Sequence, residues 1–295
     1  MRETSLEQLN SANRAEFVAA LADIFEHSPW VPEAAAAERP FATLAQLYER
    51  LKTALLSAGE DRQLAVITAH PDLAGKAARA GTLTPASTAE QASAGLDQLS
   101  EPEYAAFHRF NEAYKARFGF PFIICVRRHT KDSILQALER RTKSDAATER
   151  AAALTEILRI VALRLDQRVR APDRLAVHGR LSTHVLDNLS GRPGEGVALE
   201  LFELSRAGER RSIARAVTND DGRTDAPLIT GRPVPTGAYE LRFAIGDYYA
   251  RTKAALADPP FLDVVPIRFS VAEPEGHYHV PLLCTPWSYT TYRGS

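Results

Sequence analysis

Cysteine is almost absent from this sequence, which has two such residues in 295. Cys125 and Cys284 stand in different halves of the chain, each within an apolar run, so buried free thiols are expected rather than a disulfide or a metal pair. The N-terminus is polar and lacks the apolar centre of a secretory signal. Together these features predict a cytoplasmic protein.

The sequence also lacks long hydrophobic runs and an excess of charge of one sign. No apolar run approaches the roughly 20 residues of a membrane-spanning helix, so no membrane partner is expected. The 36 Lys and Arg residues nearly balance the 37 Asp and Glu residues, which gives no reason to expect nucleic acid as a partner. What remains is a chain longer than one typical domain, and two domains are expected.

The first half of the chain has the apolar spacing of helices. Apolar residues recur every three or four positions over 17–25, 43–56 and 144–168. A further helix is expected to begin at Ser100, before a proline in its first turn. Gly and Pro flank the apolar stretch 122–126, which is expected to be a short extended or irregular buried segment.

An arginine interrupts the apolar face of the last of these helices. Arg164 follows Ile157 by seven residues, so it returns to the same face of the helix. A guanidinium on an apolar face is costly unless a negative group meets it. Arg164 is therefore expected to reach the rim, to pair with a structural carboxylate, or to bind an anionic part of a ligand.

The stretch 70–97 contains further candidate residues. His70 ends an apolar run, and Pro71 disfavours helical geometry at the residue before it, so His70 is expected to end a buried element and face an opening. Ser87 and Glu90 have the spacing of a capping box, in which both side chains satisfy backbone donors at a helix start. They can equally face a ligand, and the local sequence leaves both interpretations open.

Alternation with a period of two replaces the helical pattern after a short linker, expected at 170–179. The alternating stretches are 181–186, 197–204, 213–217, 239–245, 264–271 and 278–283. A single helix is expected over 248–256. Short strands separated by turns predict a β-sandwich. The expected fold is therefore multidomain, with an all-α domain at 1–169 and an all-β domain at 180–295.

Histidines mark the strands of the second half. His277 and His279 share one strand face because of their spacing of two, and His184 lies on an earlier strand. Arg223 follows a predicted tight turn. Three histidines that include an H-x-H pair are also a common zinc arrangement, so ligation of zinc and a structural role are both open at this point.

Five blocks of the first half resemble the family of 2-oxo-4-hydroxy-4-carboxy-5-ureidoimidazoline (OHCU) decarboxylases of urate degradation. They are EHSPW from Glu26, RPF from Arg39, HPDLAGK from His70, SxxEQxxAGLD from Ser87 and FGFPFIICV from Phe118. The resemblance implies a cofactor-free enzyme with His70 and Glu90 as catalytic residues. It implies substrate contacts from Pro71, Ser87, Gln91, Phe122, Ile123 and Arg164. One departure is Arg128, where the family pattern leads us to expect glycine.

The motifs LSTHVLD, DGR, YHVPLL and the terminal YRGS resemble 5-hydroxyisourate hydrolase of the transthyretin-like family. The resemblance covers about residues 178–295. It implies that His184, Arg223 and His279 are catalytic, that Tyr292 and Ser295 bind substrate, and that no metal takes part. A histidine would activate water, and Arg223 would stabilise the oxyanion that develops on the carbonyl.

The two implied activities are consecutive, since the product of the hydrolase is the substrate of the decarboxylase. The resemblance therefore predicts a bifunctional enzyme that acts on small purine-derived molecules and converts 5-hydroxyisourate through OHCU to (S)-allantoin. A ligand-binding protein and a fusion with one inactive domain are the alternatives. Relatives of both halves form dimers or tetramers, so a homo-oligomer is expected.

Overall fold

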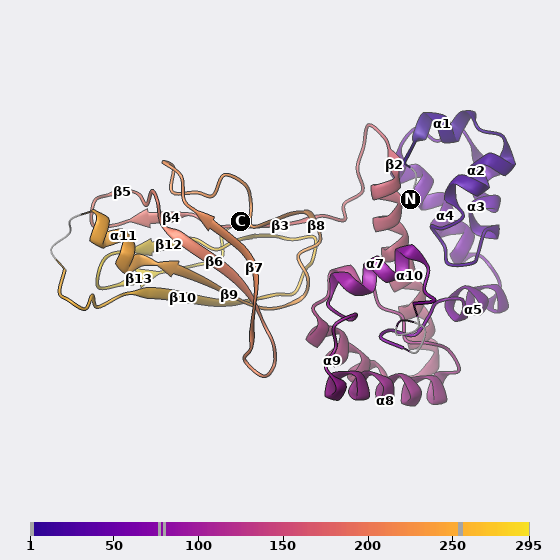
Figure 1. The fold of residues 1–295 in the computed structure, drawn as a ribbon. Helices are drawn as coiled ribbons and strands as arrows, with labels where there is room; N and C mark the ends of the chain where they lie inside the picture. Colours follow the sequence, from indigo (N-terminus) through magenta and orange to yellow (C-terminus); the bar gives the residue numbers. More distant parts are fainter. Residues whose placement is uncertain (1–2, 76–77, 79–80, 253–255, 295) are drawn as a thin grey trace. The chain divides into compact units, whose positions relative to one another are not determined.

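The chain divides into two compact units, Met1–Val177 and His178–Ser295, in the computed structural model (Figure 1). The structure describes residues 3–75, 78, 81–252 and 256–294. Each unit has its own buried apolar core. The division falls within the segment 170–179, where a linker was expected.

The described part of the first unit is helical. Its helices are α1 (Leu6–Ser11), α2 (Arg14–Leu21), α3 (Trp30–Ala35), α4 (Leu44–Leu56), α5 (Glu60–Thr68), α7 (Pro85–Ser93), α8 (Glu101–Phe118), α9 (Lys131–Arg141) and α10 (Ala146–Arg168), with the 3₁₀ turns η1 (Ala36–Glu38) and η2 (Val126–Arg128). Two short strands, β1 (Thr4–Ser5) and β2 (Val169–Arg170), pair in parallel. The unit is thus helical with one small strand pair.

Side-chain caps begin the helices that the apolar spacing predicted. Asn13 caps α2, Thr43 caps α4 and Asp145 caps α10. At the start of α8, the Glu103 carboxylate accepts a 2.8 Å hydrogen bond from the Ser100 backbone N–H. Each cap satisfies backbone donors that a helix start leaves unpaired. Helices α1, α3, α5 and α9 were not predicted.

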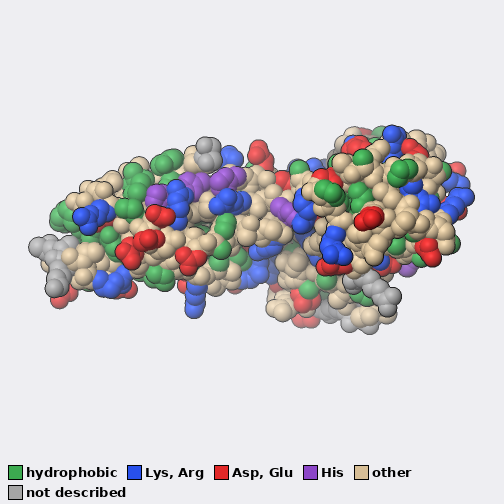
Figure 2. All heavy atoms as spheres, turned by 90° about the horizontal axis from the view of Figure 1, so that it is seen from above, with side chains coloured by type: hydrophobic (Ala, Val, Ile, Leu, Met, Phe, Trp, Pro, Cys, Tyr) green, Lys and Arg blue, Asp and Glu red, His purple; other side chains and the backbone are tan. Residues whose placement is uncertain are grey.

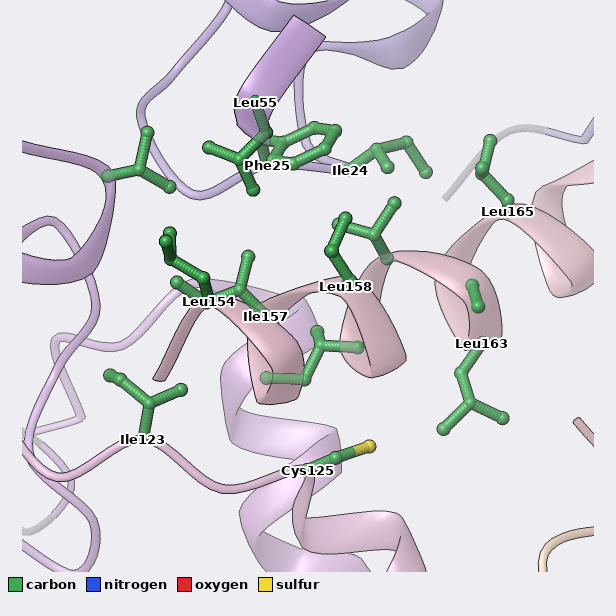
Figure 3. Packing of buried hydrophobic residues seen from close by; sticks show 14 of the residues in the cluster. Ile24, Phe25, Leu55, Ile123, Cys125, Leu154, Ile157, Leu158, Leu163 and Leu165 are labelled. Atoms are coloured by element: carbon green, nitrogen blue, oxygen red, sulfur yellow. The ribbon is translucent and has the colours of Figure 1, made fainter. Parts of the chain in front are cut away.

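Helix α10 forms the centre of the first core. Its apolar side chains Leu154, Ile157, Leu158 and Leu165 are buried. Figure 3 shows Ile24 and Phe25 facing this helix from one side, while Ile123 and Cys125 lie on the other. The segment 121–125 has no regular secondary structure, as the flanking Gly and Pro predicted. Because α10 is enclosed in this way, a polar residue on it must find its partners inside the unit.

The second unit is rich in β-strands. Its described strands are β3 (Gly179–Ser182), β4 (Val185–Asp187), β5 (Arg192–Pro193), β6 (Ala198–Leu204), β7 (Arg210–Val217), β8 (Ile229–Arg232), β9 (Gly237–Ala244), β10 (Val264–Val271), β11 (His277–His279), β12 (Leu282–Cys284) and β13 (Tyr289–Thr290). They form sheets in the orders β10-β9-β6-β7, β11-β3-β8 and β13-β12-β4-β5. Helix α11 (Ile245–Arg251) begins and ends earlier than the predicted helix 248–256, part of which lies outside the described residues.

Two of the predicted strands are each divided in the structure. The stretch 181–186 is divided between β3 and β4, and 278–283 between β11 and β12. Both breaks occur side by side, because β11 pairs with β3 and β12 pairs with β4, each in parallel. His184 lies in the first break and forms an isolated antiparallel bridge with Arg223. Two predicted site residues, His184 and Arg223, therefore lie side by side at the break between β3 and β4.

Both cysteines, Cys125 and Cys284, are buried and free, as predicted. Among the described helices, none is both long enough and apolar enough to cross a membrane.

Candidate active sites

All of the site residues predicted in the first half line one pocket. The predicted members are His70, Pro71, Ser87, Glu90, Gln91, Phe122, Ile123 and Arg164, and they are joined by Leu73, Ile124, Val126 and Ile160. They come from the segment that follows α5, from α7, from the segment 122–126 that leads into η2, and from α10. The pocket therefore combines a few polar groups with an apolar wall, as small-molecule sites do.

The imidazole of His70 is held by the backbone of α5, the helix that precedes it. Its Nδ1 lies 2.8 Å from the carbonyl oxygen of Val66. A carbonyl oxygen only accepts hydrogen bonds, so Nδ1 carries the proton and Nε2 has the free lone pair. Burial lowers the pKa of His70 below its usual value, although the Val66 carbonyl and the carboxylate of Glu26 act in the opposite direction. His70 is thus neutral at pH 7, with Nε2 available to a ligand.

Arg164 is buried, with 2% of its surface exposed, and forms a two-fold ion pair with Glu90. Its Nε lies 2.8 Å and its Nη2 2.9 Å from the two oxygens of Glu90. Its Nη1 donates to Glu26 at 3.1 Å and to the carbonyl of Asp23 at 3.1 Å. Within the described residues, four of the five guanidinium N–H groups are engaged. Glu90 already occupies the side of the guanidinium formed by Nε and Nη2, which could otherwise bind a substrate carboxylate with two hydrogen bonds. One N–H on Nη2 remains for a ligand.

Glu26 is a polar residue of this site that the sequence did not single out, although it begins the EHSPW block. It is 4% exposed, and besides Arg164 it accepts hydrogen bonds from Thr84 at 2.9 Å and from Ser87 at 3.3 Å. Burial alone would raise the pKa of Glu26, but Arg164 and the Thr84 hydroxyl lower it below the usual value. An isolated acidic residue beside a turn has no periodic signal that would have identified it.

The capping-box interpretation of Ser87 and Glu90 is wrong. Helix α7 begins at Pro85, and its cap is Thr84, whose hydroxyl accepts a hydrogen bond from the Ser87 backbone N–H. This leaves the Ser87 hydroxyl free to donate to Glu26, and Glu90 free to pair with Arg164. Both side chains face the pocket because the helix starts three residues earlier than the capping box required.

Gln91 secures the turn that follows His70. Its side-chain oxygen accepts a 2.9 Å hydrogen bond from the backbone N–H of Ala74, a residue with a φ of 50°. A positive φ is strained for alanine, and this hydrogen bond helps to hold it. Gln91 therefore shapes the pocket in addition to lining it.

Two charged side chains fix the apolar wall around Ile123. Arg141 donates a 2.8 Å hydrogen bond to the carbonyl of Ile123, and its guanidinium carbon lies 4.6 Å from the ring centre of Phe122. Glu156 accepts a 2.8 Å hydrogen bond from the backbone N–H of Cys125. Arg128, the departure from the family pattern, follows this wall in η2 and is absent from the described lining of the pocket.

In the second unit, one serine hydroxyl joins two histidines. Ser182 Oγ lies 3.2 Å from Nε2 of His277 and 3.0 Å from Nδ1 of His279. Strands β11 and β3 are in register here, with His279 opposite Ser182. This contact is made through Nδ1 and orients the His279 ring. Figure 2 shows histidine side chains beside Lys and Arg side chains on one face of this unit.

His184 and Arg223 meet across the bridge between their backbones. Arg223 follows Gly222, whose φ is 71°, and a Cβ there would lie 2.3 Å from the carbonyl oxygen of Val185. Only glycine allows this approach. Burial, followed by the charge of Arg223, lowers the pKa values of both His184 and His279. Nε2 of His184 is buried without a hydrogen-bond partner among the described residues.

The C-terminal segment reaches the same histidines. Gly294 donates a 2.9 Å hydrogen bond to the carbonyl of His279, and a Cβ at Gly294 would lie 2.7 Å from the His279 ring. Tyr292 is 56% exposed. The predicted substrate contact Ser295 lies outside the described residues.

The first unit thus has a buried site with one imidazole, one guanidinium and two carboxylates, while the second has a more open site with three histidines and an arginine. Each lies in a unit with its own core. These features define a protein of two compact units, each with a chemically distinct candidate site.

The chain belongs to the OHCU decarboxylase family through residues 10–166 and to the HIUase/transthyretin family through residues 181–294. Over 168 residues it is 44% identical to a 2-oxo-4-hydroxy-4-carboxy-5-ureidoimidazoline decarboxylase of Haloferax volcanii, covering 57% of this chain and 98% of that protein. Over 117 residues it is 54% identical to a 5-hydroxyisourate hydrolase of Ralstonia nicotianae, covering 40% of this chain and 99% of that protein.

A solved structure matches both units at once. The crystal structure of an (S)-allantoin synthase is 34% identical to this chain, with a TM-score of 0.52, and the match covers 99% of this chain and 100% of that one. The order of the two units along the chain is therefore shared with a protein that has the same domain composition.

Proposed function

We propose that this chain is a bifunctional enzyme of urate degradation, as its sequence predicted. The second unit would hydrolyse 5-hydroxyisourate to OHCU, and the first would decarboxylate OHCU to (S)-allantoin. The observation that carries this proposal is the match to an (S)-allantoin synthase over nearly the full length of both chains. Both reactions are assigned to side chains and backbone groups of the protein, without a cofactor.

For the decarboxylation, we assign the proton transfer to His70. When the bond between the ring carbon and the carboxylate breaks, carbon dioxide leaves and the electron pair is delocalised into the ring before a proton is added. The Val66 hydrogen bond supports this assignment because it fixes the tautomer with Nε2 free. Glu90 and Ser87 line the pocket as partners for substrate N–H or hydroxyl groups, and one N–H of Arg164 remains for a substrate oxygen.

For the hydrolysis, we assign activation of water to His184, to His279 or to both. The lowered pKa values of both rings support this role, because the neutral form of a histidine is the one that accepts a proton. Arg223 would stabilise the negative charge that develops on the attacked carbonyl oxygen. Tyr292 and Ser295 are proposed as substrate contacts of the C-terminal motif.

Several finer statements belong to the same proposal. We assign decarboxylase activity to 1–169, a linker to 170–179 and hydrolase activity to 180–295. The single core cluster of the second unit supports a β-sandwich, since it joins side chains of different sheets. The exposed aromatic residues Trp287 and Tyr289 support a homo-oligomer. The free buried thiols support a cytoplasmic location.

The test is to add the chain to fresh 5-hydroxyisourate and to follow ultraviolet absorbance and circular dichroism together. An active pair of sites consumes the substrate and produces an optically active product. Faster loss of absorbance without optical activity would mean that the decarboxylase site is inactive. No acceleration of either signal over buffer would contradict the enzymatic proposal and favour a ligand-binding protein.

A further inference from the structure

In the part of the helical pocket that the structure describes, two carboxylates are paired with a single guanidinium. Glu26 and Glu90 are both paired with Arg164, so their two negative charges face one positive charge. His70 is neutral at pH 7, since burial lowers its pKa. The nearby Asp72 is already paired with Lys115 at 2.8 Å. Among the described residues, the charged groups with the largest effect on His70 are Glu26, Arg164 and Glu90, and the charges of these three groups sum to −1.

The substrate of the proposed decarboxylation is itself an anion. A carboxyl group on a carbon beside electron-withdrawing atoms is ionised at neutral pH. Placing a second uncompensated negative charge in a buried site is unfavourable, and the least costly remedy is to bind a proton. The group best placed to take it is His70, whose Nε2 has a free lone pair and whose Nδ1 is already committed to Val66.

The reaction consumes one proton in the same place. A carboxylate loses carbon dioxide, its bonding electron pair moves into the ring, and one proton forms the new bond to carbon, so that the anion and the proton give a neutral product and carbon dioxide. A proton taken up with the substrate is the proton that the product needs. After turnover His70 is neutral again and the pocket returns to its initial charge, and the neutral product does not require a bound proton.

We propose that substrate binding in the helical pocket is linked to the uptake of one proton by His70, and that Glu26 is the positioning residue that imposes this linkage. This linkage rests on the proposed decarboxylase function and adds to it how the proton of the reaction enters the site. Glu26 supplies the excess charge without lining the pocket surface, because it lies behind Arg164 and Ser87. Linkage is reciprocal, so the proton also strengthens binding of the anion.

The first test measures proton uptake on the full chain by isothermal titration calorimetry. Hydantoin-5-acetate serves as a stable anionic probe and hydantoin-5-acetamide as its neutral counterpart, each titrated at about pH 7.5 in phosphate and in Tris, which differ in ionisation enthalpy. We expect the chain to take up about one proton when it binds hydantoin-5-acetate and almost none when it binds hydantoin-5-acetamide. Binding of the acetate with no net uptake of protons would overturn the proposal.

Glu26→Gln and Glu26→Asp form the matched pair of variants. Glutamine keeps one acceptor oxygen for the hydroxyls of Thr84 and Ser87 but loses both the negative charge and the oxygen that accepts from Arg164, so the uptake should fall to less than about one third of a proton. Aspartate keeps the charge and should keep the uptake. Equal binding of the amide by all three proteins checks that the pocket is intact. Uptake that stays unchanged in Glu26→Gln would remove Glu26 from the linkage.

A second readout uses OHCU itself and needs no probe. Above neutral pH, the KM of the wild-type chain should rise about three- to tenfold per pH unit, while that of Glu26→Gln should stay within about twofold over the same interval. A KM that does not change with pH in the wild-type chain would contradict the linkage even if both probes bind too weakly to measure. A chain that forms no (S)-allantoin from OHCU would instead contradict the proposed function, which distinguishes the two failures.

Discussion

At the scale of single residues, the most informative signal in the sequence was an arginine on an apolar helix face. That anomaly led to Arg164, which the structure buries between Glu26 and Glu90. The chemistry of a buried charge requires a partner but does not say which one, so the same reasoning did not find Glu26. Its contacts with Thr84 and Ser87 join positions about 60 residues apart, which no local pattern encodes.

Replacing His70 with asparagine should stop allantoin formation and leave the fold intact. Asparagine can still donate a hydrogen bond to the Val66 carbonyl, but it cannot accept or deliver a proton as imidazole does. We expect the rate of decarboxylation to fall by about 10² to 10⁴. The same preparation should consume 5-hydroxyisourate normally, which provides an internal control. Near-normal formation of (S)-allantoin would exclude His70 from the mechanism.

Replacing Arg164 with methionine should strongly destabilise the first unit. The change leaves Glu26 and Glu90 buried without a positive partner, and breaking a buried ion pair costs about 3–5 kcal/mol. Arg150→Met is the control, because Arg150 lies on the same helix and its partner Glu60 is 75% exposed, so this change should have little effect on stability. Urea denaturation of the full chain measures both, and equal effects would argue against the burial-based explanation.

In the second unit, Arg223→Gln should move the acid limb of the hydrolase pH profile to higher pH. Burial is the largest cause of the low pKa of His279, and the charge of Arg223 is the next. Without that charge the imidazole holds its proton up to a higher pH, so the neutral base is lost sooner as pH falls. The position of this limb in kcat/KM is the measurement, since it is separate from any overall loss of rate. An unchanged limb would mean that another group controls it.

At the scale of elements, periodicity located most of the long helices and strands but not their interruptions. The stretch 181–186 alternates without a break in the sequence, yet the chain changes from β3 to β4 at His184. At this position the backbone partner of His184 is Arg223, which is 39 residues further along the chain, so the local sequence has no signal for the break. Similarly, the start of α7 at Pro85 depends on the cap at Thr84, whose signal was weaker than the Ser-x-x-Glu spacing.

The irregular segment 122–126 should depend on Arg141 for its position. Arg141→Met removes the hydrogen bond to the Ile123 carbonyl and leaves Glu149 without its ion-pair partner. We expect a several-fold higher KM for OHCU and a loss of about 1–3 kcal/mol of stability, with no change in hydrolase activity. Arg117→Met is the matched control, because Arg117 donates to a carbonyl at an exposed position. A similar KM in both variants would show that the wall does not need this support.

At the scale of the whole molecule, the change of period near residue 170 predicted two units, and the structure has two. Each unit has a separate apolar core, and the division between Val177 and His178 follows from that separation. A chain with two independent cores behaves as two folding units joined by a covalent link. Joining the two units raises the local concentration of the OHCU released by the second unit near the decarboxylase site of the first unit, compared with two separate proteins.

Cutting the gene between Val177 and His178 should therefore give two fragments that fold and work separately. The fragment 178–295 should consume 5-hydroxyisourate without optical activity, and adding the fragment 1–177 should restore an optically active product. With separate fragments, the yield of (S)-allantoin should fall as both are diluted, because OHCU decays before it meets the second catalyst. With the joined chain, the yield should depend less on dilution. Identical dilution curves for the fragments and the joined chain would show that the link gives no kinetic advantage, and a fragment that fails to fold would show that the two cores are not independent.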